Sequence, residues 1–229
     1  MIAVNYNTTP EVSRENKSVN DVCKALGLED GCNIIRNELR RADSYANQLN
    51  PETSARQSIG MAFWAMLHGG LNETVAAQPS WDIVRPRNKV PYLRNKENGV
   101  KILLVSGEES PCGSGDVRSR YSKGLNFLKN VAYNQQQLHL FDETCYTDVS
   151  FEACCNDTVW ALFYDRKMLS SGRSSLRAWL AVPVSNDSTG RIDASIHRVA
   201  VPLNKVEPQT IKEPVAETEE FSVQRKVGS

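Results

Sequence analysis

The sequence predicts an α+β protein in which N-terminal helices pack on a mixed, mainly antiparallel β-sheet. Two observations support this prediction. Apolar residues in the first third of the chain recur every three or four positions, which is the period of a helix. Near the end, the segments TVWALFYDRK, SSLRAWLAVPVS and RIDASIHRVAVPL are strand-like and are separated by turns rich in Ser, Gly, Asn and Asp, which is typical of an antiparallel meander.

Composition limits the classes of protein to consider. The 229 residues include 27 Lys and Arg and 27 Asp and Glu, so no net charge attracts nucleic acid, a membrane or an acidic ligand, and any charge argument must be local. The chain has no basic leader with an apolar core and no run of about 20 apolar residues, so we expect a cytoplasmic protein without a membrane partner. Six scattered cysteines without a Cys-x-x-Cys pair indicate buried thiols rather than a metal site, and no cofactor is expected.

We expect one compact domain, because no Pro/Gly/Ser-rich linker divides the helices from the strands. The last residues are rich in Pro and Glu and poor in apolar side chains, which predicts a disordered tail. The expected organisation is a flexible arm at 1–17, a single α+β domain at 18–203 and the tail at 204–229, the domain comprising a helical part (18–70), a mixed part (81–135) and a β-rich part (138–203).

Three helices are predicted in the helical part. Ser18 caps the first and Gly27 ends it; Asp30 caps the second, which ends before Asn50. The third is expected from Pro51 to Gly69-Gly70, since proline suits a first turn and glycine commonly ends a helix. The expected inward residues are Ile35, Leu39, Ala42, Ala46 and Leu49 in the second helix and Ile59, Ala62, Phe63, Met66 and Leu67 in the third.

The first two predicted helices also allow a helix-turn-helix interpretation, in which Arg36, Arg40 and Arg41 face DNA. Cys23 and Asn33 stand where that motif needs a small and an aliphatic residue. A plain helical hairpin is therefore the preferred interpretation.

The mixed part is expected to begin with strands at Val90–Leu93 and Val100–Ser106, joined by a turn at Asn95–Gly99. Asp116 is expected to cap a helix that contains Val117 and runs to about Asn134. A short strand is expected at Leu138–Phe141, whereas 145–155 could be a strand or a loop.

The last strand changes phase along its length. Ile192, Ala194 and Ile196 alternate inward, but Val199 and Val201 continue in the opposite phase. One extra residue near His197 and Arg198 would restore the alternation, which predicts a β-bulge there.

Basic and aromatic residues are interleaved from Trp81 to Lys129. This stretch contains ten Lys and Arg but only five Asp and Glu. Cations that meet phosphates and rings that stack on bases are typical of single-strand binding. An ordinary solvated surface is the competing interpretation. The predicted nucleic-acid-binding residues are Arg85, Arg87, Lys89, Tyr92, Arg94, Arg118, Arg120, Lys123, Arg173, Arg177 and Trp179.

We therefore expect a non-enzymatic, nucleic-acid-associated binding or regulatory protein, of the accessory kind that phages and plasmids encode. One alternative is a nuclease with Mg²⁺ as cofactor, because carboxylates can hold the metal while a lysine stabilises developing charge. Its catalytic residues would be Asp148, Asp157, Asp165 and Lys167. Another alternative is an inhibitor or assembly subunit whose partner is a protein, and the oligomeric state is left open.

Overall fold

The computed structural model describes residues 17–49, 55–87, 91–109, 117–139, 149–170 and 174–203. Within them, helices pack on a seven-stranded mixed sheet with the strand order β1-β2-β3-β5-β6-β7, while β4 pairs with β3, and the predicted α+β class is confirmed. The helical elements are α1 (Val19–Ala25), α2 (Gly31–Gln48), α3 (Arg56–Ala76), α4 (Leu125–His139) and the 3-10 turn η2 (Ala153–Cys155). The strands are β1 (Trp81–Val84), β2 (Tyr92–Asn95), β3 (Lys101–Glu109), β4 (Val117–Ser119), β5 (Val159–Met168), β6 (Ser174–Asn186) and β7 (Ile192–Ala200).

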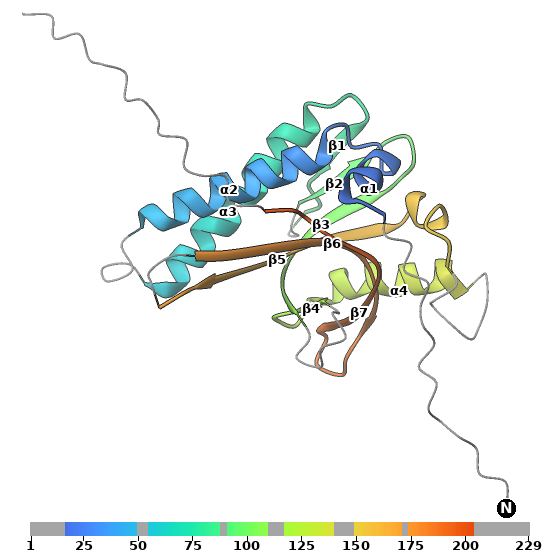
Figure 1. Cartoon of the computed structure of the whole chain (residues 1–229). Coiled ribbons are helices and arrows are strands. Elements are labelled where there is room, and N and C mark those ends of the chain that lie inside the picture. Colours follow the sequence, from blue (N-terminus) through green and yellow to red (C-terminus); the bar gives the residue numbers. More distant parts are fainter. Residues whose placement is uncertain are drawn as a thin grey trace, which may run out of the picture.

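The sheet separates two hydrophobic cores. Helices α1, α2 and α3 lie on one side of it and α4 on the other (Figure 1). The first core joins those three helices to residues such as Leu93, Ile102 and Leu180, and the second joins α4 to residues such as Phe163 and Trp179. A strand residue that belongs to the first core faces α1–α3. The residues just before and after it on the strand face the α4 side, because side chains alternate along a strand.

The predicted meander is confirmed by antiparallel pairing of β5 with β6 and of β6 with β7. As expected, Leu176, Ala178 and Leu180 face one side while Arg177 and Trp179 face the other. Strands β3 and β5 pair in parallel, from Lys101 opposite Val159 to Ser106 opposite Tyr164. The carboxyl ends of these two strands therefore lie together.

The predicted β-bulge in β7 is confirmed. Leu180 pairs with Val199 and Val182 with Ile196, so Ala181 stands opposite both His197 and Arg198. His197 has a positive φ of 49°, which places the extra residue in the left-handed region.

The predicted ends of α1 are also confirmed. Ser18 forms a capping box with Asp21, and Gly27 has φ +73° after the last turn. Asp30 does precede α2, but its side chain makes no capping bond, so that prediction was wrong in mechanism. Its backbone is left-handed, with φ 50°, and its carboxylate accepts from the Asn33 amide instead.

The predicted end of α3 at Gly69-Gly70 was wrong, because the helix continues to Ala76. Gly70 serves helix packing: a Cβ there would lie 1.9 Å from Glu38 Oε2 and 2.3 Å from Arg41 Nη2, both on α2. Glu38 is buried, and its Oε2 lies 2.9 Å from Arg41 Nε. Glycine at this position therefore lets α3 pack closely against the Glu38–Arg41 ion pair of α2.

Two predictions in the mixed part were also wrong. Val117–Ser119 is not the first turn of a helix but strand β4, which pairs with Gly107–Glu109, and α4 begins only after Gly124. Leu138 lies in α4 rather than in a strand. Both errors involve short segments whose conformation depends on residues distant in sequence. Strand β1 was not expected at all.

Several predictions fall outside the described residues. These are the arm up to residue 16, Pro51, Val90, Asp116, Phe141 and the tail at 204–229. The last residue of the predicted arm, Lys17, is described, and its ammonium lies 3.0 Å from Glu152 and 4.0 Å from the centre of the Phe151 ring. None of the helices in the described ranges is long and apolar enough to span a bilayer.

Candidate functional site

The predicted nucleic-acid-binding residues fall into two groups, and the first lies at the β1–β2 end of the sheet. Tyr92 and Arg94 flank Leu93 on β2, and Leu93 belongs to the first core. Since side chains alternate along a strand, Tyr92 and Arg94 face the α4 side. Arg85 and Arg87 follow β1 and are exposed.

The arginines of this first group have no acidic partner among the described residues. Arg85, Arg87 and Arg94 are all exposed and take part in none of the ion pairs found there. Asp82 stands opposite Arg94 in the register, but its carboxylate lies 3.7 Å from Lys96 Nζ. Within the described ranges, these three guanidinium groups are therefore not neutralised by an acidic side chain.

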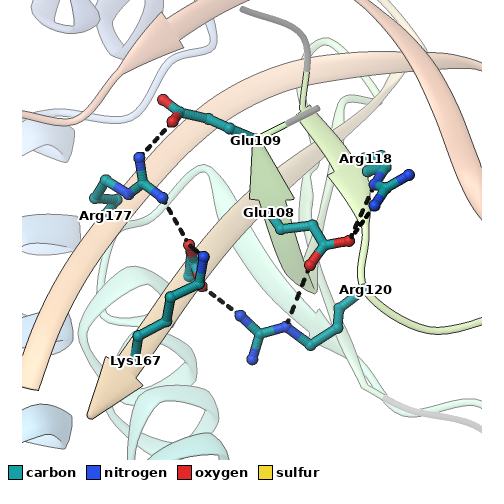
Figure 2. A network of polar contacts seen from close by, with 7 residues as sticks. Glu108, Glu109, Arg118, Arg120, Lys167 and Arg177 are labelled. Atoms are coloured by element: carbon teal, nitrogen blue, oxygen red, sulfur yellow. Dashed lines mark hydrogen bonds and ion pairs between the residues drawn. The ribbon is translucent and has the colours of Figure 1, made fainter. Parts of the chain in front are cut away.

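The second group surrounds Asp165, near the carboxyl end of β5 (Figure 2). Asp165 is 1% exposed, and its carboxylate accepts hydrogen bonds from Arg120 and, at 3.0 Å, from Arg177 Nη2. Lys167 Nζ lies 3.3 Å from the same carboxylate. One buried negative charge is therefore held by three cations, which compensates the cost of removing it from water.

Two glutamates at the end of β3 complete this arrangement, which we call the Asp165 cluster. Glu108 Oε1 lies 2.8 Å from Arg118 Nη2, and Glu109 pairs with Arg177 (Figure 2). Burial acts to lower the pKa of Arg177, but the hydrogen bonds and negative charges of Asp165 and Glu109 outweigh it and raise that pKa. Seven residues form the cluster, namely Glu108, Glu109, Arg118, Arg120, Asp165, Lys167 and Arg177.

Two further predicted residues lie in neither group. Trp179 is 5% exposed in the second core, with the Arg177 guanidinium 5.6 Å from its ring centre, so the ring is not an open stacking surface. Lys123 is partly buried, and burial lowers its pKa. Lys89 and Arg173 lie outside the described residues.

Among the described residues of the nuclease alternative, Asp165 and Lys167 are in contact, but Asp157 lies apart from them. Asp157 precedes β5 and Asp165 lies eight positions further along the chain, which corresponds to roughly 25 Å of extended backbone. Asp157 instead accepts from the Tyr133 hydroxyl and lies 3.7 Å from Lys101 Nζ. Asp148 lies outside the described residues, and those described contain no group of three or more His, Cys, Asp or Glu that could hold a metal ion.

Two residues that sequence reasoning did not assign to the site lie beside its first group. Lys101 pairs with Arg94 in the register of β2 and β3, and its ammonium lies 5.2 Å from the centre of the Tyr133 ring on α4. Lys101 and Tyr133 lie far apart in the chain, so the sequence alone does not reveal their contact. A sequence feature that could have drawn attention to Tyr133 is its position next to Asn134 at the end of the predicted helix, because Asn134 is a buried polar residue in the structure.

No protein-family model, no curated protein and no solved structure matches this chain.

Proposed function

We propose that this protein binds nucleic acid without cleaving it, as an accessory or regulatory protein, and that phosphates contact the β1–β2 end of the sheet. The observation that supports this proposal is the exposure of Arg85, Arg87 and Arg94 without an acidic partner in the described part of the chain. A guanidinium presents a planar fork of N–H donors that matches a phosphate, and it stays charged at every physiological pH.

Local charge supports the same surface. Six Lys and Arg but only two Asp and Glu lie between Trp81 and Lys101, in a chain whose total charge is zero. By contrast, the arginines of the Asp165 cluster already neutralise carboxylates, so a phosphate would have to compete with them. Phosphate contacts are therefore assigned to the first group and not to the second.

The test is fluorescence anisotropy with labelled single- and double-stranded DNA and RNA at 50 and 200 mM salt, with EDTA or with Mg²⁺. Three phosphate contacts to a single strand predict a fall in affinity of roughly twentyfold over this range of salt, at a slope of about 0.7 per contact. Arg85→Ala with Arg87→Ala should reduce the slope by about 1.4. The matched control is Lys24→Ala with Lys129→Ala, which removes two exposed charges on α1 and α4.

Each other outcome has a defined meaning. An intact probe retained equally by both double variants contradicts the assignment of Arg85 and Arg87. Cleavage that requires Mg²⁺ would replace the proposal with the nuclease alternative, whose predicted catalytic residues are Asp148, Asp157, Asp165 and Lys167. Absence of binding to every probe at 50 mM salt would leave a protein partner as the surviving proposal.

A further inference from the structure

The outer face of α3 carries no charge. Residues 57–72 contain no Asp, Glu, Lys or Arg, although several of them are exposed. A helix at a protein surface normally presents charged and polar side chains to water, and a helix that is apolar on all sides is normally covered. The outer face of α3 therefore has the composition of a contact surface.

Large and small apolar residues share this face. Met61 is 69% exposed, and Ala65 and Gly69 are exposed as well. These three residues recur every fourth position, so they form one stripe along the helix. Trp64, 39% exposed, flanks the stripe. Covering a large apolar side chain that is now exposed stabilises a complex by roughly 1.5–3 kcal/mol when its burial is complete.

Gly69 is not explained by the packing of a single chain. A Cβ at Gly70 would collide with Glu38 of α2, whereas a Cβ at Gly69 would meet no atom of the described residues within 4 Å. Glycine in the interior of a helix costs about 0.8–1 kcal/mol relative to alanine, and α3 continues beyond Gly69 to Ala76. Close approach of another helix is an arrangement that requires glycine at such a position.

His68 does not add a charge to the stripe at neutral pH. It is the one titratable side chain in residues 57–72. It is buried, its ring centre lies 4.7 Å from the centre of a ring of Trp64, and its Nε2 has no hydrogen-bond partner in the described part of the chain. Burial lowers its pKa to about 4, so the imidazole is neutral near pH 7. Two copies of this face can therefore meet without repulsion between like charges.

From this arrangement we infer that α3 is the contact of a homodimer, in which the α3 helices of two copies pack antiparallel about a two-fold axis near Ala65. Met61 and Gly69 lie four residues from Ala65 in opposite directions, so the axis places Met61 of one copy against Gly69 of the other. The methionine then fills the space that the glycine leaves. A parallel pair would instead set methionine against methionine and glycine against glycine. The second copy is thus the partner that this stripe fits.

The inference goes beyond the proposed function and does not depend on it. Helix α3 belongs to the first core, whereas Arg94 faces the α4 side of the sheet. One helix of about 31 Å from each copy makes a small contact. Small interfaces are typical of weak complexes, so we expect a dissociation constant on the order of 10 µM.

The test is sedimentation velocity of the full chain from about 1 to 200 µM, where the wild type should shift from monomer to dimer. Met61→Glu should raise the dissociation constant at least tenfold, because the contact would bury an unpaired carboxylate. The control Leu125→Glu changes another exposed apolar residue, on α4, and should leave the dissociation constant unchanged.

Gly69→Leu separates loss of the contact from loss of the fold. It should raise the dissociation constant at least tenfold, because leucine occupies the space that receives Met61. At about 1 µM, where the chain is monomeric, the same variant should unfold at a higher temperature than the wild type, because leucine is a better helix former than glycine.

Ala65→Cys tests the orientation. A residue on the two-fold axis lies beside its own copy, so this variant should form a disulfide-linked dimer with oxidised glutathione, above the wild-type background. The control Gln57→Cys should not, because in an antiparallel pair its two copies lie roughly 24 Å apart. A wild type that stays monomeric at 200 µM, a dimer unaffected by Met61→Glu and Gly69→Leu, or equal cross-linking of the two cysteine variants would overturn the inference. Each of these results would leave the nucleic-acid proposal as it stands.

Discussion

Arginines in two parts of the sheet have opposite surroundings. Around Asp165, four cations stand among three carboxylates, and the central carboxylate is almost completely buried. At the β1–β2 end, Arg85, Arg87 and Arg94 are exposed and have no ion-pair partner among the described residues. Arginines that the sequence presents as one basic set therefore differ in their surroundings: those around Asp165 pair with carboxylates of neighbouring strands, whereas those at the β1–β2 end are the ones proposed to bind phosphate.

The two predicted aromatic platforms differ in the same way. Trp179 lies in the second core beneath the Arg177 guanidinium, while Tyr92 remains partly exposed on β2. Burial decides which ring contributes to folding and which can meet a base.

The largest expected effect is that of removing Asp165. Asp165→Ala should lower the free energy of unfolding by about 3–5 kcal/mol, because it removes the charged hydrogen bonds that Arg120 and Arg177 donate to this buried carboxylate, each of which contributes roughly 1.5–3 kcal/mol. Urea denaturation measures this effect. The control is Asp82→Ala: the Asp82 side chain is 57% exposed and lies 3.7 Å from Lys96 Nζ, so the expected change is at most about 0.5 kcal/mol. Equal losses in the two variants would contradict a structural role for the cluster.

Trp179→Ala should cost about 3–5 kcal/mol of stability, since it empties a large volume in the second core. Tyr92→Leu, at a partly exposed position, should cost less than about 1 kcal/mol and act on ligand affinity instead. Thermal unfolding of both variants separates the two roles. If Tyr92→Leu unfolds the protein as readily as Trp179→Ala, then Tyr92 is a core residue and not a binding platform.

Arg120→Ala should lower stability by about 1.5–3 kcal/mol, because the protein loses a charged hydrogen bond to a buried carboxylate. Arg87→Ala should leave stability unchanged to within about 0.5 kcal/mol. The midpoints of urea unfolding of these two single variants compare one arginine from each part of the sheet. A loss in Arg87→Ala of the size expected for Arg120→Ala would show that Arg87 is tied into the fold.

The smallest effect is expected at Lys167, whose side chain is 53% exposed although it contacts Asp165. Solvent screening limits an exposed pair to roughly 0–1 kcal/mol, so Lys167→Ala should lie near the error of the same urea measurement. A loss above about 2 kcal/mol would place Lys167 on a level with the two arginines of Asp165.

Periodicity predicted those parts of the fold in which neighbouring residues determine the conformation. The alternation in β5, β6 and β7 identified three strands, and the change of phase after Ile196 located the bulge at His197 and Arg198. Contacts between residues distant in sequence explain the predictions that were wrong. Gly69 and Gly70 resemble a helix end, but Gly70 is required by Glu38 and Arg41 of α2, which lie about 30 positions away in the chain.

The candidate site was less predictable for the same reason. Local composition identified the basic residues, but the partner of Arg120 is 45 positions away in the chain, and only the pairing of β3 with both β4 and β5 places it there. The contact between Tyr133 and Lys101 was missed because Lys101 belongs to β3, a strand that lies much earlier in the chain. The sequence shows which residues are charged or aromatic, but the register of the sheet determines which of these side chains are in contact.

The most direct test of the account is the salt dependence of single-strand affinity in Arg87→Ala and Arg118→Ala, one arginine without and one with an acidic partner. If phosphates contact the β1–β2 end of the sheet, the slope of log affinity against log salt should fall by about 0.7 in Arg87→Ala and stay at the wild-type value in Arg118→Ala. A fall confined to Arg118→Ala would contradict it, because phosphates would then contact the Asp165 cluster and not the β1–β2 end of the sheet.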